Sequence, residues 1–440
     1  MIYTRENTVY KSKTLSTYKI IGLSLFALLF FRILSLTLLH WATGGNEIAS
    51  DIKYISMFVE NPFGFFYGTT ARNISSYAPL EGLIYSPLAN LFQPIFGKFV
   101  SFRFISLICE FIGVFFLFKV ILDKAVKANE SSLLVLQILA CIAAPYMIMV
   151  STVTGQDEII GFMFMCMAVA AIHYSNKSLA LISLGCGVLF SKIFFIVPLF
   201  YVLFFCKFRF RDILLVLPVF LIYLLTFYSA YKNNGHMPFV GFSPSASHSV
   251  LFWILLIKTQ ILGSVDNVKN IGLLISVFSQ IILIILFWRK RKWLLERVEN
   301  QAILLAFPLL LFLMFFYQHN PEYLILSLPP LIYLVKKPKH LMYIVFTYSF
   351  AWIPKIITIV ANTIGESGRL SSTRMQLVND MFHLSKFQVM GIDLALGHIH
   401  FLTVIVYSLL YIFLLVKFCQ ILIAMSVARS NDQKINTRKL

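Results

Sequence analysis

The chain has few charged residues and very few acids. Charged residues make up 13% of its 440 residues, with 19 acids against 37 lysines and arginines. Apolar residues reach 59%, and the mean hydropathy is +0.82. A soluble domain of this length needs a much larger polar surface, so this class is excluded. Several apolar runs reach the roughly 20 residues that cross a hydrocarbon core, which predicts an all-α polytopic membrane protein.

The sequence also lacks the patterns that build disulfide frameworks and metal sites. No internal repeat or low-complexity segment is present. None of the six cysteines forms a Cys-x-x-Cys pair. All of them lie in or at the edge of apolar runs: Cys109, Cys141, Cys166, Cys186, Cys206 and Cys419. Neither a disulfide framework nor a metal site follows from this spacing.

The excess of basic residues suggests a membrane topology and not a nucleic-acid partner. The formal net charge is +18, but lysine and arginine gather in short loops between apolar runs, where they fix orientation. The N-terminal residues 1–19 are polar and basic. The run that follows, Ile20 to Trp41, is too long for a signal-peptide core and has no small-residue cleavage site. We expect it to be a retained first span, with both termini in the cytoplasm.

Hydropathy predicts about twelve spans in one transmembrane domain over residues 1–440. Residues 42–98 are interrupted by four prolines and suit interfacial helices in a first outer loop. This topology requires the stretches 79–97 and 246–265 to stay outside, a last outer loop at 363–395 and a cytoplasmic tail at 425–440. All basic clusters then fall on one face. The spans after the first are predicted at 99–122, 132–153, 159–175, 178–190, 193–205, 213–231, 270–288, 300–317, 323–335, 341–362 and 396–424.

This topology brings four polar groups to the outer face, each at a helix end: Asp51, Gln156-Asp157-Glu158, Lys192 and His319. A charge at such depth usually lines a wet cavity or meets a charged ligand. Each group also has a plainer explanation. Asp51 suits a solvated loop, Asp157 and Glu158 suit a helix N-terminus, Lys192 can extend to the interface and His319 suits an interfacial position. Their convergence favours a site.

The residue types in this group indicate a chemistry. Asp51 can act as a general base. Four cations can neutralise a phosphate at the lipid–water boundary: Lys192, His319, Arg72 and Arg103. Aromatic residues crowd the first outer segment, including Tyr77 and Tyr85, and sugar rings stack on such faces, although an interfacial aromatic belt explains them equally well. Together these groups suggest glycosyl transfer from a lipid phosphate.

Short motifs in a fixed order carry a family resemblance. The first span and its following Asp51 precede Tyr77-Ala78-Pro79-Leu80, Tyr85-Ser86-Pro87-Leu88, Gly155-Gln156-Asp157-Glu158, Ser191-Lys192 before Pro198, and Gln318-His319-Asn320 before Leu328-Pro329. In this order the chain resembles the integral-membrane GT-C glycosyltransferases, and within them the bacterial branch that uses polyprenyl-phosphate sugars. Serotype-modifying transferases that add glucose to O-antigen are similar in size and topology.

The sequence departs from the pattern of that branch in three places. Glu158 stands where asparagine is usual, Ala78 replaces a proline, and His319 replaces a common histidine pair. These departures bear on the sugar and the acceptor more than on the reaction class.

The resemblance implies a GT-C-like bundle in the bacterial inner membrane with its active site on the periplasmic face. The donor would be a polyprenyl-phosphate sugar, and the acceptor a glycan or lipid-linked glycan such as lipopolysaccharide O-antigen. Asp51 would take the proton of the acceptor hydroxyl, and Lys192 with His319 or an arginine would hold the leaving phosphate. Substrate contacts would come from Tyr77, Tyr85 and residues 156–158.

The number of carboxylates decides the stereochemical course. A single displacement with inversion needs one carboxylate, whereas a retaining mechanism also needs a nucleophile. Glu47 and Glu60 stay candidates for the nucleophile of a retaining mechanism. Side-chain cations suffice for a monophosphate leaving group, so neither a metal nor another cofactor is expected.

Two other functions compete with this hypothesis. An O-antigen polymerase or ligase, which uses a polyprenyl-diphosphate oligosaccharide, tends to carry paired arginines in a large outer loop, and the loop at 363–395 contains Arg369 and Arg374. A secondary transporter has two related halves with interrupted spans and ionisable residues near the midplane. Here the polar residues gather toward one face and the halves do not match, which favours a transferase.

Overall fold

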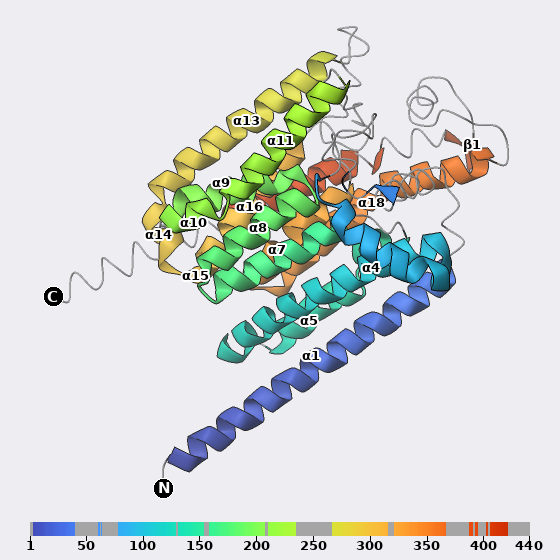
Figure 1. The fold of residues 1–440 in the computed structure, drawn as a ribbon. Coiled ribbons are helices and arrows are strands. Elements are labelled where there is room, and N and C mark those ends of the chain that lie inside the picture. Colours follow the sequence, from blue (N-terminus) through green and yellow to red (C-terminus); the bar gives the residue numbers. More distant parts are fainter. Residues whose placement is uncertain are drawn as a thin grey trace. The chain divides into compact units, whose positions relative to one another are not determined.

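The protein is described by a computed structural model, which covers residues 3–39, 60–61, 63, 78–128, 131–153, 158–206, 210–234, 266–315, 321–366, 387–389, 392–394, 402–403 and 405–420. This part of the chain is almost entirely helical (Figure 1), as its apolar composition predicts. Strands β1 (Phe387–Val389) and β2 (Ile392–Leu394) form a short antiparallel hairpin inside the predicted last outer loop, with Phe387 opposite Leu394.

The helices follow the predicted apolar runs. In the described part of the chain the α-helices include α1 (Tyr3–Leu39), α4 (Gly82–Ala128), α5 (Ser131–Ile142), α6 (Pro145–Ile148), α7 (Glu158–His173), α8 (Lys177–Phe190), α9 (Ile196–Phe205), α10 (Phe210–Leu214), α11 (Leu217–Asn234), α13 (Asp266–Arg289), α14 (Arg291–Glu296), α15 (Val298–Gln301), α16 (Ile303–Phe315), α17 (Leu328–Leu334) and α18 (Pro338–Glu366). Two 3₁₀ segments, η3 (Ile193–Phe195) and η5 (Pro321–Ser327), and one π-helical segment, η2 (Met149–Val153), connect them.

Four helical stretches of the described chain are long and apolar enough to cross a membrane: Lys19–Thr37, Val100–Val126, Ser132–Thr152 and Phe210–Ser229. They coincide with the predicted first span and with those at 99–122, 132–153 and 213–231. Shorter apolar helices, such as Lys177–Phe190 and Ile405–Gln420, occupy ranges of other predicted spans. These helices are compatible with a membrane protein, and the total of twelve spans stays a prediction.

Helix α4 contains a break at Gly97, after its two prolines, Pro87 and Pro94. Gly97 has φ 72° and ψ 171°, a conformation that favours glycine because a Cβ would be strained there. The break separates the proline-containing turns of Gly82–Phe96 from the membrane-length stretch Val100–Val126. This division lies where the sequence predicts the change from an interfacial helix to a span. The interfacial position of the first part stays a prediction.

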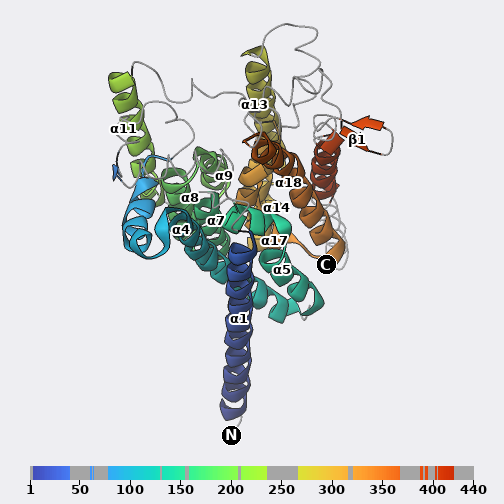
Figure 2. The same ribbon diagram turned by 90° about the vertical axis from the view of Figure 1, so that its right-hand side faces the viewer.

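The chain divides into two compact units, residues 1–196, 208–241 and 325–341 and residues 197–207, 242–324 and 342–440. The prediction of a single domain is left open by this division. In the first unit, α4, α7 and α8 pack together, and the C-terminal part of α1 meets α4 and α5 (Figure 2). In the second, α13 packs along α16, and the Tyr411 hydroxyl donates to the Leu310 carbonyl at 2.7 Å.

A polar cluster fixes α17 against α4 and α7 in the first unit. His173 Nε2 lies 2.7 Å from Asp123 Oδ2, and its Nδ1 lies 3.1 Å from the Tyr333 hydroxyl. Lys124 donates to the Tyr333 carbonyl at 2.6 Å, and Gln137 to the Ile332 carbonyl at 2.8 Å. The last carbonyls of a helix have no partner within the helix. Lys124 and Gln137 therefore donate hydrogen bonds to carbonyls at the C-terminal end of α17. The helix dipole also favours a cation such as Lys124 at this end.

Candidate functional site

A buried ion pair joins two of the predicted site residues. Glu158 is the first residue of α7, and Lys192 follows the end of α8 in an extended conformation before η3. The Lys192 ammonium lies 3.3 Å from Glu158 Oε1, and both side chains are buried. A buried charge is costly, and a partner of opposite sign offsets much of that cost. The two motifs that contain these residues thus converge, as the sequence predicts.

Glu81 and Tyr223 lie near this pair. Glu81 is fully buried just ahead of α4, and its Oε2 accepts a hydrogen bond from the backbone N–H of Ala78 at 3.2 Å. The Leu80 N–H donates to the Leu189 carbonyl at 2.9 Å, which ties this turn to the end of α8. Tyr223, on α11, lies close enough to interact electrostatically with both Glu81 and Lys192. A second buried carboxylate therefore belongs to the turn that is tied to the end of α8, ahead of Lys192.

The sequence analysis missed both residues, although Glu81 offered a signal. It is an acid in an otherwise apolar, proline-rich stretch and directly follows the Tyr77–Leu80 motif. Tyr223 offered none, because tyrosines are common in membrane helices. Its hydroxyl donates to the Val188 carbonyl at 2.9 Å, a contact set only by packing of α11 on α8.

Three other predicted residues lie in the described part of the chain. Tyr85 is fully buried and meets Phe102 edge-on with the ring centroids 6.0 Å apart. A sugar can stack on its ring only if neighbouring side chains move. Arg103 is also buried, on the membrane-length part of α4, and Glu60 is exposed. Their predicted roles in binding stay predictions.

The remaining predicted residues lie outside the described part of the chain: Asp51, Glu47, Arg72, Tyr77, Gln156, Asp157 and His319. Their distances to the Lys192–Glu158 pair therefore rest on the sequence alone. Gln156 and Asp157 immediately precede Glu158 in the chain.

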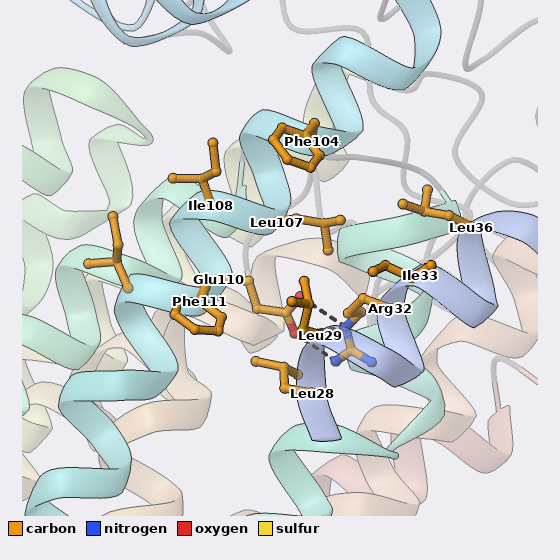
Figure 3. Close-up of a pocket in the computed structure, with 11 residues that line it drawn as sticks. Leu28, Leu29, Arg32, Ile33, Leu36, Phe104, Leu107, Ile108, Glu110 and Phe111 are labelled. Carbon is orange, nitrogen blue, oxygen red and sulfur yellow. Dashed lines mark hydrogen bonds and ion pairs between the residues drawn. The ribbon is translucent and has the colours of Figure 1, made fainter. Parts of the chain in front are cut away.

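A second buried ion pair, which the sequence analysis did not predict, joins α1 to α4 (Figure 3). Arg32 Nε donates to both Glu110 oxygens at 3.1 and 2.9 Å, and Nη2 donates to Oε1 at 2.6 Å. The other guanidinium contacts are to the carbonyls of Ile142 at 2.7 Å and Cys141 at 3.3 Å. A charged side chain within an apolar run is unusual and indicates a buried partner. Arg32 and Glu110 were missed because hydropathy is averaged over a whole run.

The contacts of Arg32 stabilise the break within the membrane-length apolar stretch Ser132–Thr152. Helix α5 ends at Ile142, and Pro145 begins α6, so the last carbonyls of α5 have no partner within the helix. In hydrocarbon such groups must be satisfied by the protein. Arg32 donates to two of them, and the Tyr146 hydroxyl donates to the Ala140 carbonyl at 3.0 Å.

Gly161 allows the close approach on which the Lys192 turn depends. A Cβ at this position would lie 2.5 Å from Leu326 Cδ2, 2.6 Å from Ser191 Oγ and 3.0 Å from Phe195 Cε2. Replacement by alanine should therefore displace the turn next to Lys192 and lower the free energy of unfolding by about 1–3 kcal/mol. Gly22 is the matched control because its Cβ would meet nothing within 4 Å. Equal unfolding free energies for Gly161→Ala and Gly22→Ala would contradict this packing.

The described residues offer charge pairs but no metal site. Within the ranges given above, no three His, Cys, Asp or Glu side chains gather closely enough to hold a metal ion. What they offer a ligand is a buried ammonium with one carboxylate in contact. Comparison of the sequence with protein-family models and with curated proteins found no match to either.

Proposed function

We propose that the protein is an integral-membrane glycosyltransferase of the GT-C type. It transfers a hexose from a polyprenyl-phosphate sugar to a hydroxyl of a glycan or glycolipid on the non-cytoplasmic face. The observation that best supports this proposal is the buried Lys192–Glu158 pair, with its 3.3 Å separation. A resemblance built on short motifs requires that the motifs meet in space, and these two motifs do. The motif residue Ala78 also donates its N–H to Glu81, which lies nearby.

The proposed reaction is a single displacement at the anomeric carbon. Asp51 accepts the proton of the acceptor hydroxyl, and that oxygen forms a bond to the anomeric carbon. The bond from this carbon to the phosphate oxygen breaks, and polyprenyl phosphate leaves with the electron pair. Lys192 holds the anionic phosphate both in the bound donor and in the departing polyprenyl phosphate. An ammonium donates to anionic oxygens, and a phosphate oxygen is such an acceptor.

The choice of donor tests the reaction class. Membranes that carry the protein are supplied with an acceptor fraction and with either a labelled polyprenyl-phosphate monosaccharide or a labelled polyprenyl-diphosphate oligosaccharide. We expect only the monosaccharide donor to be consumed, with label appearing in the acceptor. Consumption of the diphosphate donor alone would favour a polymerase or ligase. Consumption of neither, against control membranes without the protein, would reject the transferase proposal.

Replacing Lys192 with alanine should raise the KM for the lipid-linked sugar. A hydrogen bond to a charged group contributes about 1.5–3 kcal/mol, so the expected increase is roughly tenfold or more, with a smaller change in kcat. Initial rates across a range of donor concentrations measure it. Lys177→Ala is the matched control because it removes the lysine that begins α8, at the opposite end of that helix from Lys192.

A second variant separates donor binding from folding. Lys192→Ala leaves Glu158 buried without its cation, whereas Lys192→Met combined with Glu158→Gln keeps the volume and removes both charges. We expect the double variant to show the same raised KM in a stably folded protein. A normal KM in the double variant would assign Lys192 a purely structural role.

A further inference from the structure

Four consecutive cations lie at the turn between α13 and α14, in the second unit (Figure 1). Helix α13 ends at Arg289, Lys290 interrupts the helix with φ −105° and ψ 12°, and α14 begins at Arg291. Lys292 is the fourth cation of the run. Arg289, Lys290 and Lys292 are exposed, and Arg291 is half-buried. The turn therefore places four positive charges at one end of an apolar helix.

The four cations have no acidic partner in the part of the chain that the structure describes. The Arg291 guanidinium instead lies over an aromatic ring, 5.1 Å from the centre of the Trp288 ring. In the first unit, by contrast, Arg32 and Lys192 each pair with a buried glutamate. The turn after α13 therefore presents uncompensated positive charge to its surroundings.

The residues before the turn set its depth in a bilayer. The preceding helical stretch Leu274–Arg289 is apolar, with exposed side chains such as Ile285 and Leu286. Trp288 is also exposed near its end, and tryptophan is enriched where the hydrocarbon core meets the headgroups. The cations follow this tryptophan within about one helical turn. They therefore lie at the level of the lipid phosphates.

An exposed aromatic row adjoins the cations within the same unit. The rings of Phe200 and Phe204, on α9, are stacked with their centroids 5.7 Å apart and their planes inclined by 11°. The Phe204 centroid lies 5.6 Å from that of Trp288, which in turn contacts Arg291. All three rings are exposed. A cationic end next to an apolar face matches the two parts of a lipid, its phosphate and its acyl chain.

We propose that the turn after α13 binds the phosphate headgroup of an anionic glycerophospholipid, with an acyl chain against the aromatic row. Charge complementarity selects this class, because a zwitterionic headgroup carries its own ammonium. Arginine forms paired hydrogen bonds to phosphate. Stacking of Arg291 on the Trp288 ring leaves its donors in the guanidinium plane. The site goes beyond the proposed sugar transfer and does not depend on it, since none of these residues has a role in that reaction.

The test measures which phospholipid the full-length protein retains. The protein is assembled into vesicles of phosphatidylglycerol and phosphatidylethanolamine in equal parts and is then exchanged into neutral detergent until bulk lipid is removed. Native mass spectrometry identifies the lipid that remains. We expect phosphatidylglycerol to be retained in preference. This preference should fall at high salt in the exchange buffer, because the screening length shortens from about 10 Å at 0.1 M to about 3 Å at 1 M.

Glutamine substitutions remove the charges of the turn. Arg289→Gln, Lys290→Gln and Lys292→Gln combined should lower the preference for phosphatidylglycerol by about tenfold or more, because each cation near an anionic membrane surface strengthens the attraction about fivefold. These three side chains are exposed, so their replacement leaves the packing of α13 intact. Arg291→Gln is a separate variant, so that poor folding of one variant does not decide the result.

The matched control removes the same number of charges from another basic cluster. Lys336→Gln, Lys337→Gln and Lys339→Gln combined replace three exposed lysines between α17 and the first turn of α18. The predicted topology places this cluster on the same face of the membrane. We expect the control to keep the preference for phosphatidylglycerol.

Several results would overturn the proposal. One is the absence of a preference in the unsubstituted protein. An unchanged preference in both variants of the turn would assign its cations to membrane topology alone, and an equal loss in the lysine control would indicate attraction by net charge without a site. Displacement of the lipid by soluble glycerol phosphate would make the turn a site for a free anion. Preferential retention of added polyprenyl phosphate would assign it to the proposed donor lipid.

Discussion

Replacing Glu110 with leucine should lower the free energy of unfolding by about 3–5 kcal/mol, the usual cost of removing one partner of a buried ion pair. The carboxylate accepts from two nitrogens of Arg32 at 2.6–3.1 Å, and both side chains are 1% exposed. An arginine cannot lose its proton to escape burial. Leucine is somewhat larger than glutamate and leaves no cavity, so the loss reflects charge and hydrogen bonding more than an unfilled space. Unfolding of the full-length protein by denaturant in mixed micelles measures it.

A double variant tests whether the cost comes from the unpaired guanidinium. Arg32→Met combined with Glu110→Leu removes both charges and should recover part of the loss. Recovery stays incomplete, because the carbonyls of Cys141 and Ile142 lose their donor, and an unsatisfied buried acceptor costs about 1–3 kcal/mol. The matched control is Arg211→Gln, in an ion pair with Asp212 whose arginine is largely exposed. Exposed pairs contribute little, so a Glu110→Leu effect no larger than the control would contradict the assignment.

The positions of the helices could be read from the sequence because each depends on local composition. The apolar runs at 99–122 and 132–153 coincide with membrane-length helices, and in the structure the second is interrupted before Pro145. What stabilises that interruption comes from α1, far away in the chain. A span prediction averages hydropathy over a window, so one arginine and one glutamate barely change its score. Only packing shows that Arg32 and Glu110 belong together.

The candidate site was predictable to a similar degree. Lys192 and Glu158 stood out because charges next to apolar runs are rare and costly, and the structure brings them into contact. Glu81 joins them through the backbone bond from Leu80 to Leu189, which no local pattern encodes. The solvent exposure of a side chain could not be predicted from the sequence either. Tyr85 is of a residue type that stacks on sugars, but its ring is fully buried. Sequence thus indicates which groups are unusual, and packing decides which of them a ligand can reach.

Replacing Asp51 with asparagine should nearly abolish sugar transfer. A general base contributes about 10²–10⁴-fold to the rate, and asparagine of the same size cannot accept the proton of the acceptor hydroxyl. We therefore expect kcat to fall by about that factor while binding of the polyprenyl-phosphate sugar changes little. Single-turnover rates and equilibrium binding of the labelled donor measure the two quantities separately. Asp266→Asn is the matched control, since Asp266 begins α13 on the same predicted face and has no assigned role.

The Asp51 and Lys192 variants together separate the two halves of the proposed mechanism. Loss of the base should act on kcat, because the proton moves only in the transition state. Loss of the ammonium should act mainly on KM, because Lys192 already holds the phosphate in the bound donor. Near-normal kcat in Asp51→Asn would remove this aspartate from the mechanism. Glu81 would then be the next candidate for the general base. If Glu81 accepts the proton, Glu81→Gln should lower kcat by the factor expected for Asp51→Asn.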